Sequence, residues 1–224
     1  MLATLSKRVV GNRSAASLAA KACFSSAGQT YGPGSTKLYE LRTYQLKPEH
    51  LMDYLVLTGS DAFKPRTEAS KCNGFFVLEM GDTLNAVCHF WEYDSFDHRT
   101  DVRASLASDT GFGQYIQTIR PWLVSQHSVM TEGWLDSDFC EAAEVGSGRY
   151  LLQKHDASVA FPAGGSDLGS TGCKNVGNFQ TVVGNANERF SLARAPSFEG
   201  LTPAFTNKEI GSTMLIPSGF SLSQ

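Results

Sequence analysis

The chain has 224 residues, of which 42% are hydrophobic and 11% aromatic, and its formal charge at pH 7 is −3. This length and composition favour one large domain or two small ones with a buried core, and they argue against a disordered chain. The five cysteines lie far apart without a CxxC pair, so neither a zinc site nor a disulfide framework is predicted.

The first 36 residues differ in composition from the rest of the chain. They contain no acidic residue, many Ser and Ala, and four basic residues, Lys7, Arg8, Arg13 and Lys21. This composition is typical of a mitochondrial presequence, so residues 1–36 are interpreted as presequence and linker, with cleavage near residues 24–28, and the protein is expected in the matrix. No transmembrane segment is predicted, because the uncharged runs are only moderately hydrophobic. Peripheral association with a membrane is left open.

Removal of this segment would leave 15 basic and 22 acidic residues, a formal charge of −7. Nucleic acid is therefore not expected as a partner, because phosphate binding requires clustered Lys and Arg. The five histidines, His50, His89, His98, His127 and His155, show no HxH or HExxH spacing. Neither a metal nor another cofactor is predicted.

The first predicted strand is LYELRTYQL, residues 38–46, because successive side chains of a strand point to opposite faces and this stretch alternates. Apolar residues at helical spacing predict a helix from Glu49 to Phe63, which Pro65 is expected to end or bend. GFFVLEM and LNAVCHFWEY, separated by a Gly81-Asp82 turn, predict an antiparallel hairpin.

The next predicted helix begins after Ser95, a residue type that caps helix N-termini. It is interrupted at residues 109–111 and resumes as far as Leu123, before strand SVMTEGWL. The order β-α-β-β-α-β predicts a ferredoxin-like domain over residues 37–136, followed by a linker at residues 137–147.

Residues 148–224 are interpreted as a second, reduced copy of this domain. GRYLLQKHDA aligns with KLYELRTYQL, so that Tyr150 matches Tyr39, and the later hairpin aligns so that Gly184 matches Gly81. The segment between them is rich in Gly, Ser and Pro, so the first helix of the copy is expected to be missing. The predicted fold class is therefore α+β, a complete unit plus a degenerate second one.

The strings YELRTYQLKP, LNAVCHFWEYDS and HRTDVRASLASD resemble the NIPSNAP family over residues 38–130. The resemblance implies a dimeric α+β barrel arrangement, in which two ferredoxin-like sheets face each other, and a mitochondrial location. It also implies protein partners, since family members have been linked to mitochondrial quality control, as tags that recruit autophagy machinery, and to vesicle transport. It supplies no catalytic residue. The string Phe75–Leu78 resembles peptides that autophagy modifiers capture as an added strand.

The faces of the first strand decide where a site is expected. Helices cover one sheet face of a ferredoxin-like unit. Tyr39, Leu41 and Thr43 are expected on that face, whereas the opposite face should look across at the second sheet.

The candidate site has five residues: Glu40, Arg42, Tyr44, His89 and Trp91. His89 and Trp91 are placed on the face of the other three, although only the register between the strands fixes this. In one interpretation they line a cleft in which Arg42 grips a carboxylate and His89 moves a proton. In the other they form a satisfied interior network in which Glu40 neutralises Arg42. The second copy has Gln153 and Ser191 where the first has Arg42 and His89, which excludes a two-fold symmetric catalytic site.

Two functional hypotheses follow. The leading one is a mitochondrial protein that acts by binding other proteins, as an adaptor in mitophagy or as an accessory subunit. Both a homo-oligomer and a hetero-oligomer are possible. The alternative is a small-molecule enzyme resembling cofactor-independent or haem-using monooxygenases, with His89 as base or ligand and Arg42 as anion clamp. An enclosed space of several hundred Å³ lined by Arg42 and His89 would favour this alternative, and an interior packed solid by Trp91, Tyr44 and Phe residues would exclude it.

Overall fold

The computed structural model describes residues 37–136, 139, 148–158, 160, 168, 172–204 and 209–218. They all belong to one compact unit within residues 31–224. The predicted presequence and its cleavage position, and most of the predicted linker, lie outside the described residues. Within the described part, no helix is long and apolar enough to cross a membrane.

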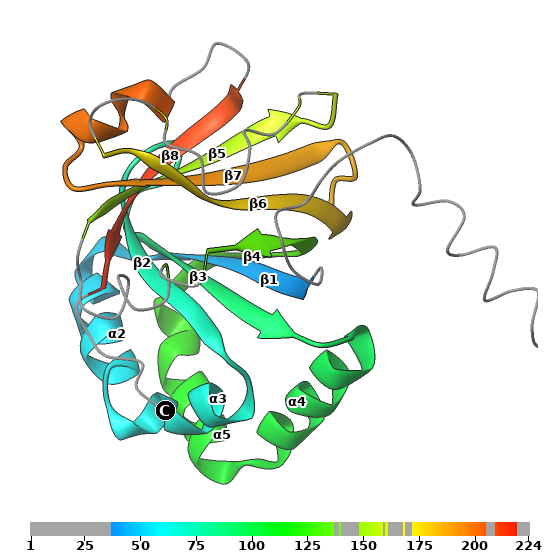
Figure 1. The fold of residues 1–224 in the computed structure, drawn as a ribbon. Helices are drawn as coiled ribbons and strands as arrows, with labels where there is room; N and C mark the ends of the chain where they lie inside the picture. Colours follow the sequence, from blue (N-terminus) through cyan, green and yellow to red (C-terminus); the bar gives the residue numbers. More distant parts are fainter. Residues whose placement is uncertain are drawn as a thin grey trace, which may run out of the picture. The chain divides into compact units, whose positions relative to one another are not determined.

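Eight antiparallel strands close into a barrel in the order β1-β3-β2-β8-β5-β7-β6-β4 (Figure 1). They are β1 Lys37–Leu46, β2 Cys72–Met80, β3 Ala86–Tyr93, β4 Leu123–Leu135, β5 Arg149–Asp156, β6 Lys174–Val183, β7 Glu188–Ala195 and β8 Glu209–Pro217. The predicted α+β class is confirmed. The predicted hairpin is also confirmed, because β2 and β3 pair directly.

The two halves of the chain meet along two strand seams. β2 pairs with β8, and β4 pairs with β6. At the second seam a Cβ added to Gly133 would lie 2.2 Å from the carbonyl oxygen of Asn178, so only glycine lets the backbones approach this closely. The aligned turn glycines Gly81 and Gly184 have φ angles of +147° and +142°, a region that L side chains rarely adopt.

The helices lie together on one face of β1–β4 (Figure 1). They are η1 Pro48–His50, α2 Leu51–Thr58, η2 Asp61–Phe63, α3 Lys64–Ala69, α4 Phe96–Ser108, α5 Thr110–Ile119 and η3 Arg120–Trp122, and η4 Glu199–Ala204 follows β7. The Ser95 hydroxyl accepts a hydrogen bond from the backbone N–H of His98, which confirms the predicted cap. Pro65 instead lies in the first turn of α3, where a missing N–H costs nothing, so the prediction that it ends a helix is wrong.

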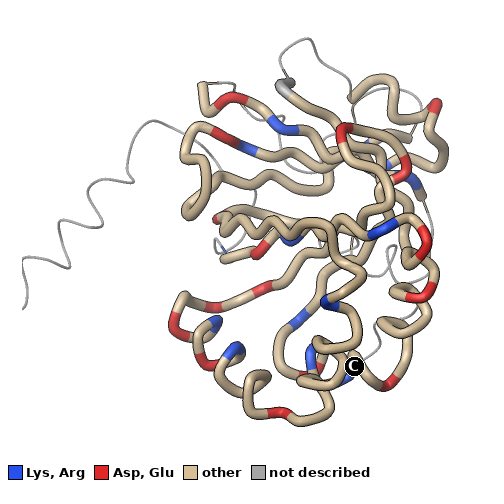
Figure 2. The backbone as a smooth tube through the Cα atoms, turned by 180° about the vertical axis from the view of Figure 1, so that it is seen from behind, with Lys and Arg blue, Asp and Glu red and all other residues tan. Residues whose placement is uncertain are grey.

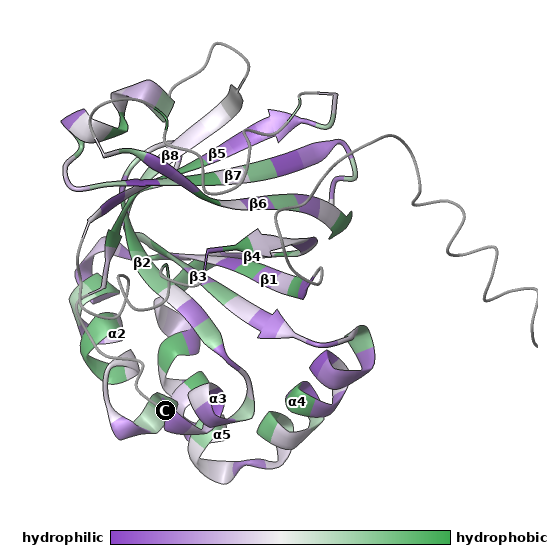
Figure 3. Cartoon of the chain, in the orientation of Figure 1, coloured by the Kyte–Doolittle hydropathy of each residue, from purple (hydrophilic) through white to green (hydrophobic). Residues whose placement is uncertain are grey.

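Two apolar layers are packed against β1–β4, one on each face. The barrel interior brings together residues of both halves: the Tyr39 and Phe179 rings are 5.4 Å apart, and the Phe76 and Tyr150 rings 5.0 Å apart. The outer layer lies between the sheet and the helices, and it contains Tyr54, Phe63, Phe75, Val87, Trp91, Tyr93, Val102, Leu106, Tyr115, Ile119 and Met130. Hydrophobic segments occur on both the helices and the strands (Figure 3).

The predicted orientation of β1 is wrong. Tyr39 and Leu41 point into the barrel interior, whereas Arg42 and Tyr44 lie on the helix-covered face. The cause is that both faces of β1 are covered, so the alternation of its residues identifies two faces without showing which one the helices cover.

Candidate functional site

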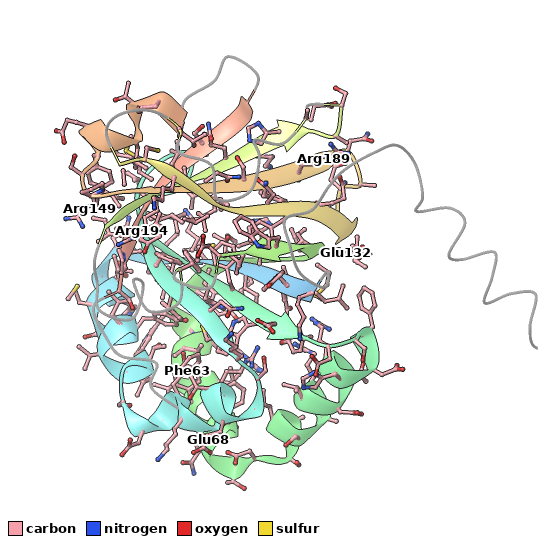
Figure 4. The ribbon with its side chains drawn as sticks, viewed as in Figure 1. Phe63, Glu68, Glu132, Arg149, Arg189 and Arg194 are labelled. Atoms are coloured by element: carbon pink, nitrogen blue, oxygen red, sulfur yellow. The ribbon has the colours of Figure 1, made fainter. Side chains whose placement is uncertain are left out.

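A cavity of about 590 Å³ lies between the helices and the sheet of the first half. Its walls come from β1, β3, η2 and α2–α5, and from the start of β4. Phe63 lies buried between the sheet and the helices, whereas Glu68 of the same helical stretch is exposed (Figure 4). The wall residues include Arg42, Tyr44, Tyr54, Phe63, Arg66, His89, Trp91, Tyr93, Leu106, Phe112, Tyr115, Ile119 and Leu123.

The pairing of β1 with β3 brings the candidate residues together. Arg42 lies opposite His89, and Glu40 lies opposite Trp91. Arg42, Tyr44, His89 and Trp91 all line the cavity. The five residues therefore share one face, as expected, but that face looks at the helices and not at the second sheet.

Glu40 is fully buried and acts as the centre of a hydrogen-bond network. Its Oε1 accepts from Arg42 Nη1 at 3.0 Å, from Arg99 Nη2 at 2.7 Å and from Ser128 Oγ at 2.6 Å, and its Oε2 accepts from the Tyr93 hydroxyl at 3.1 Å. Burial alone would raise its pKa, but Arg99, Arg42 and Ser128 together lower the pKa of Glu40 to about 2. Glu40 is thus an anion that neutralises one of the surrounding arginines.

Arg66 is a buried cation that was not among the predicted site residues. Its side chain is 7% exposed, its Nη2 donates to the Tyr93 hydroxyl at 2.8 Å, and its guanidinium carbon lies 3.4 Å from the centroid of the Trp91 ring. Its Nη1 has no hydrogen-bond partner among the described residues, and it forms no ion pair with a described carboxylate. The signal in the sequence was its spacing from Phe63, three residues earlier, which places both on the buried face of the helical stretch.

His89 is 3% exposed and held in an aromatic setting. Its ring stacks on Phe75 at 4.9 Å, and its Nδ1 accepts a hydrogen bond from the indole N–H of Trp91 at 2.5 Å. Its Nε2 has no partner among the described residues. Burial, followed by the charges of Arg42 and Arg66, holds the pKa of His89 well below its ordinary value, so the imidazole is neutral at pH 7.

The cavity is therefore basic where Arg42 and Arg66 lie beside His89 and Trp91, which is its basic end, and many of its other lining residues are apolar. Four arginines line it, Arg42, Arg66, Arg103 and Arg120, and none of its described lining residues is Asp or Glu. Elsewhere the acidic and basic residues are scattered along the chain (Figure 2). The part of the chain that the structure describes holds no group of His, Cys, Asp and Glu that could bind a metal ion. The arrangement suits a molecule with an anionic group and an apolar body.

Known proteins match this chain in sequence mainly over its first half. The family model described as NIPSNAP matches residues 39–132. "Protein NipSnap homolog 3A" of Homo sapiens is 42% identical over 71 residues, which cover 32% of this chain and 28% of that protein. This chain thus matches less than a third of that relative's length.

Solved structures extend the comparison to the fold. An uncharacterized NIPSNAP domain protein from Burkholderia xenovorans is 30% identical over 42% of this chain and 90% of that one, with a TM-score of 0.40. A mutant chlorite dismutase from Candidatus Nitrospira defluvii covers 84% of this chain and 95% of that one at 7% identity, with a TM-score of 0.50. The second likeness concerns the fold alone, and it extends over both halves of the barrel.

Proposed function

This chain belongs to the NIPSNAP family, whose model matches residues 39–132, and we propose that this domain binds a small organic anion in the cavity between β1–β4 and the helices. The observation that carries the proposal is the cavity itself. Its volume of about 590 Å³ and its lining by Arg42 and His89 support a small-molecule ligand over a solidly packed interior, although it lies between the sheet and the helices and not between two sheets.

Charge supports the choice of an anion. Three guanidinium groups, those of Arg42, Arg66 and Arg99, surround one carboxylate, that of Glu40. Buried charges are stable when they are paired, and Arg66 lacks a carboxylate partner among the described residues. An anionic ligand would supply the missing negative charge at the Nη1 of Arg66.

The walls support an apolar body for this ligand. The lining also includes the apolar side chains of Phe63, Leu106, Phe112, Ile119 and Leu123. Small-molecule sites are typically of this kind, mostly apolar with a few polar groups that fix orientation. Short-chain carboxylates have both properties and are suitable probes.

Calorimetric titration of the full chain with octanoate and with octylammonium tests the proposal, since the two probes differ in the sign of their charge. We expect octanoate to bind at least about tenfold more tightly, and Arg66→Met to remove that preference, because a paired buried charge contributes severalfold to affinity. Lys64→Met is the matched control, because Lys64 is exposed on the same helix and does not line the cavity. Equal binding of both probes, or an unchanged preference in Arg66→Met, would refute the proposal.

We also propose that the protein is imported into the mitochondrial matrix, on the composition of residues 1–36. Import of the full chain into isolated mitochondria, with no import after removal of those residues, is the expected result. Roles as a mitophagy adaptor or an accessory subunit remain proposals. The string Phe75–Leu78 gives them no support, because β2 is paired on both sides, with β3 and with β8, and has no free edge for another strand.

A further inference from the structure

The bond between Trp91 and His89 fixes which imidazole nitrogen carries the proton. Both residues lie on β3, two positions apart, so their side chains share one face. An indole nitrogen can only donate. Since Trp91 Nε1 lies 2.5 Å from His89 Nδ1, that Nδ1 presents its lone pair, and a neutral ring must carry its proton on Nε2.

The surroundings of His89 keep the ring neutral. Arg42 lies opposite it on β1, where the Tyr44 ring also contacts it at 4.9 Å, the charges of Glu40 and Arg66 act on it from β1 and α3, and Phe75 stacks on it from β2. Two of these groups are cations and only one is an anion, and Glu40 is already bonded to Arg42 and Arg99. A positive charge on the buried imidazole would therefore lack a counterion.

We infer that Trp91 is a positioning residue that fixes His89 as a hydrogen-bond donor, so that the basic end of the cavity selects carboxylates over carboxamides. Trp91 orients two donors at once, because its N–H holds the His89 ring while its aromatic face carries the Arg66 guanidinium at 3.4 Å. The His89 Nε2 and the Arg66 Nη1 are both buried and unpartnered among the described residues. A carboxylate offers a negatively charged acceptor oxygen to each of them, whereas a carboxamide is neutral and has one acceptor oxygen for both. The selectivity rests on the proposed function; the tautomer does not.

The same geometry removes His89 from two roles that the sequence suggested. A general base or a metal ligand needs a free imidazole lone pair. The lone pair on Nδ1 is occupied by Trp91, and Nε2 is protonated. His89 can therefore hold an oxyanion in place, but it cannot take a proton or bind a metal ion while the Trp91 bond persists.

The first test is the ¹⁵N NMR spectrum of the histidine rings in the ligand-free full chain, with the His89 signals assigned by their loss in His89→Gln. We expect the Nε2-protonated tautomer and no titration between about pH 5 and 8. In Trp91→Phe, which keeps an aromatic face beneath Arg66 but lacks the N–H, both tautomers should be populated. An Nδ1-protonated ring, or a His89 that titrates in this range, would overturn the inference, and the unaltered protein suffices for that result if Trp91→Phe does not fold.

The second test compares octanoate with octanamide, which has the same length and shape. The full chain should prefer octanoate at least about tenfold. His89→Gln places an amide N–H near the position of Nε2 and should retain octanoate affinity within about threefold, whereas His89→Leu should lose about tenfold. Equal losses in both variants would contradict a donor role. Failure of octanoate to bind despite the expected tautomer would refute the proposed function alone.

Discussion

The substitution Glu40→Gln tests the network that supports the basic end of the cavity. Gln keeps the size of the side chain but removes the charge that Arg42 and Arg99 contact at 3.0 and 2.7 Å. The pKa of Glu40 falls from 4.5 to about 2 in the folded protein. At about 1.4 kcal/mol per pKa unit, this shift corresponds to roughly 3 kcal/mol of folding free energy, consistent with the cost of breaking a buried ion pair.

The pH dependence follows from the direction of the shift. Because the folded-state pKa of Glu40 is lowered, its contribution is complete above the unfolded value of 4.5 and is lost as the pH falls towards 2. Urea denaturation should therefore show Glu40→Gln less stable by about 3 kcal/mol at pH 7, with a difference that shrinks below about pH 4.5.

Glu68→Gln is the matched control for this measurement. Glu68 is exposed and approaches Lys64 only to 4.0 Å, so its substitution should change the free energy of unfolding by less than about 0.5 kcal/mol. The reasoning would be refuted if Glu40→Gln lost less than about 1 kcal/mol at pH 7, or if its difference from the unaltered protein stayed constant down to pH 3.

Two further predictions concern packing. Gly133→Ala should lower the free energy of unfolding by about 1–3 kcal/mol, because the added Cβ would collide with the backbone of β6. Gly113→Ala in α5 should raise it by about 0.5–1 kcal/mol, because a Cβ added there meets no neighbouring described atom within 4 Å and Ala favours a helix. Urea denaturation of the two variants measures both changes, and equal effects would contradict the seam geometry. Cys88 should resist iodoacetamide at pH 8 in the folded protein while the half-buried Cys72 reacts, because burial raises the pKa of the Cys88 thiol to about 12. Mass spectrometry of the alkylated peptides measures the two rates, and equal rates would contradict the prediction.

Local signals in the sequence predicted the elements well. Ser95 was expected to cap α4 and does, and the Gly81-Asp82 turn was expected to join β2 and β3 and does. Both features depend on residues close together in the chain. The helix before β2 was predicted less well, because Gly59 and Ser60 divide it and Pro65 begins a helix instead of ending one.

The candidate site was predicted in its membership but not in its surroundings. Alternation grouped Arg42 with Tyr44 and His89 with Trp91, but the register between β1 and β3 was needed to put the two pairs on one face. The side of the sheet depends on which layer the helices cover, and β1 is buried on both faces, so alternation carried no information about it. Arg66 and Arg99 were missed as members of the network because they reach it only when α3 and α4 pack against the sheet.

The position of the cavity separates the constraints on the two halves of the chain. Among the residues that the structure describes, those that line it all fall between Arg42 and Gln126, on the outside of the barrel, and β5–β8 contribute none of them. Substitutions in β5–β8 are thus expected to act through the pairing of β8 with β2 and of β6 with β4, and not through direct contact with the proposed ligand. The first half can retain the proposed ligand preference while the second half changes its sequence, provided that its four strands still close the barrel and fill the shared interior. In such a protein, a shortened second half is compatible with an intact binding site.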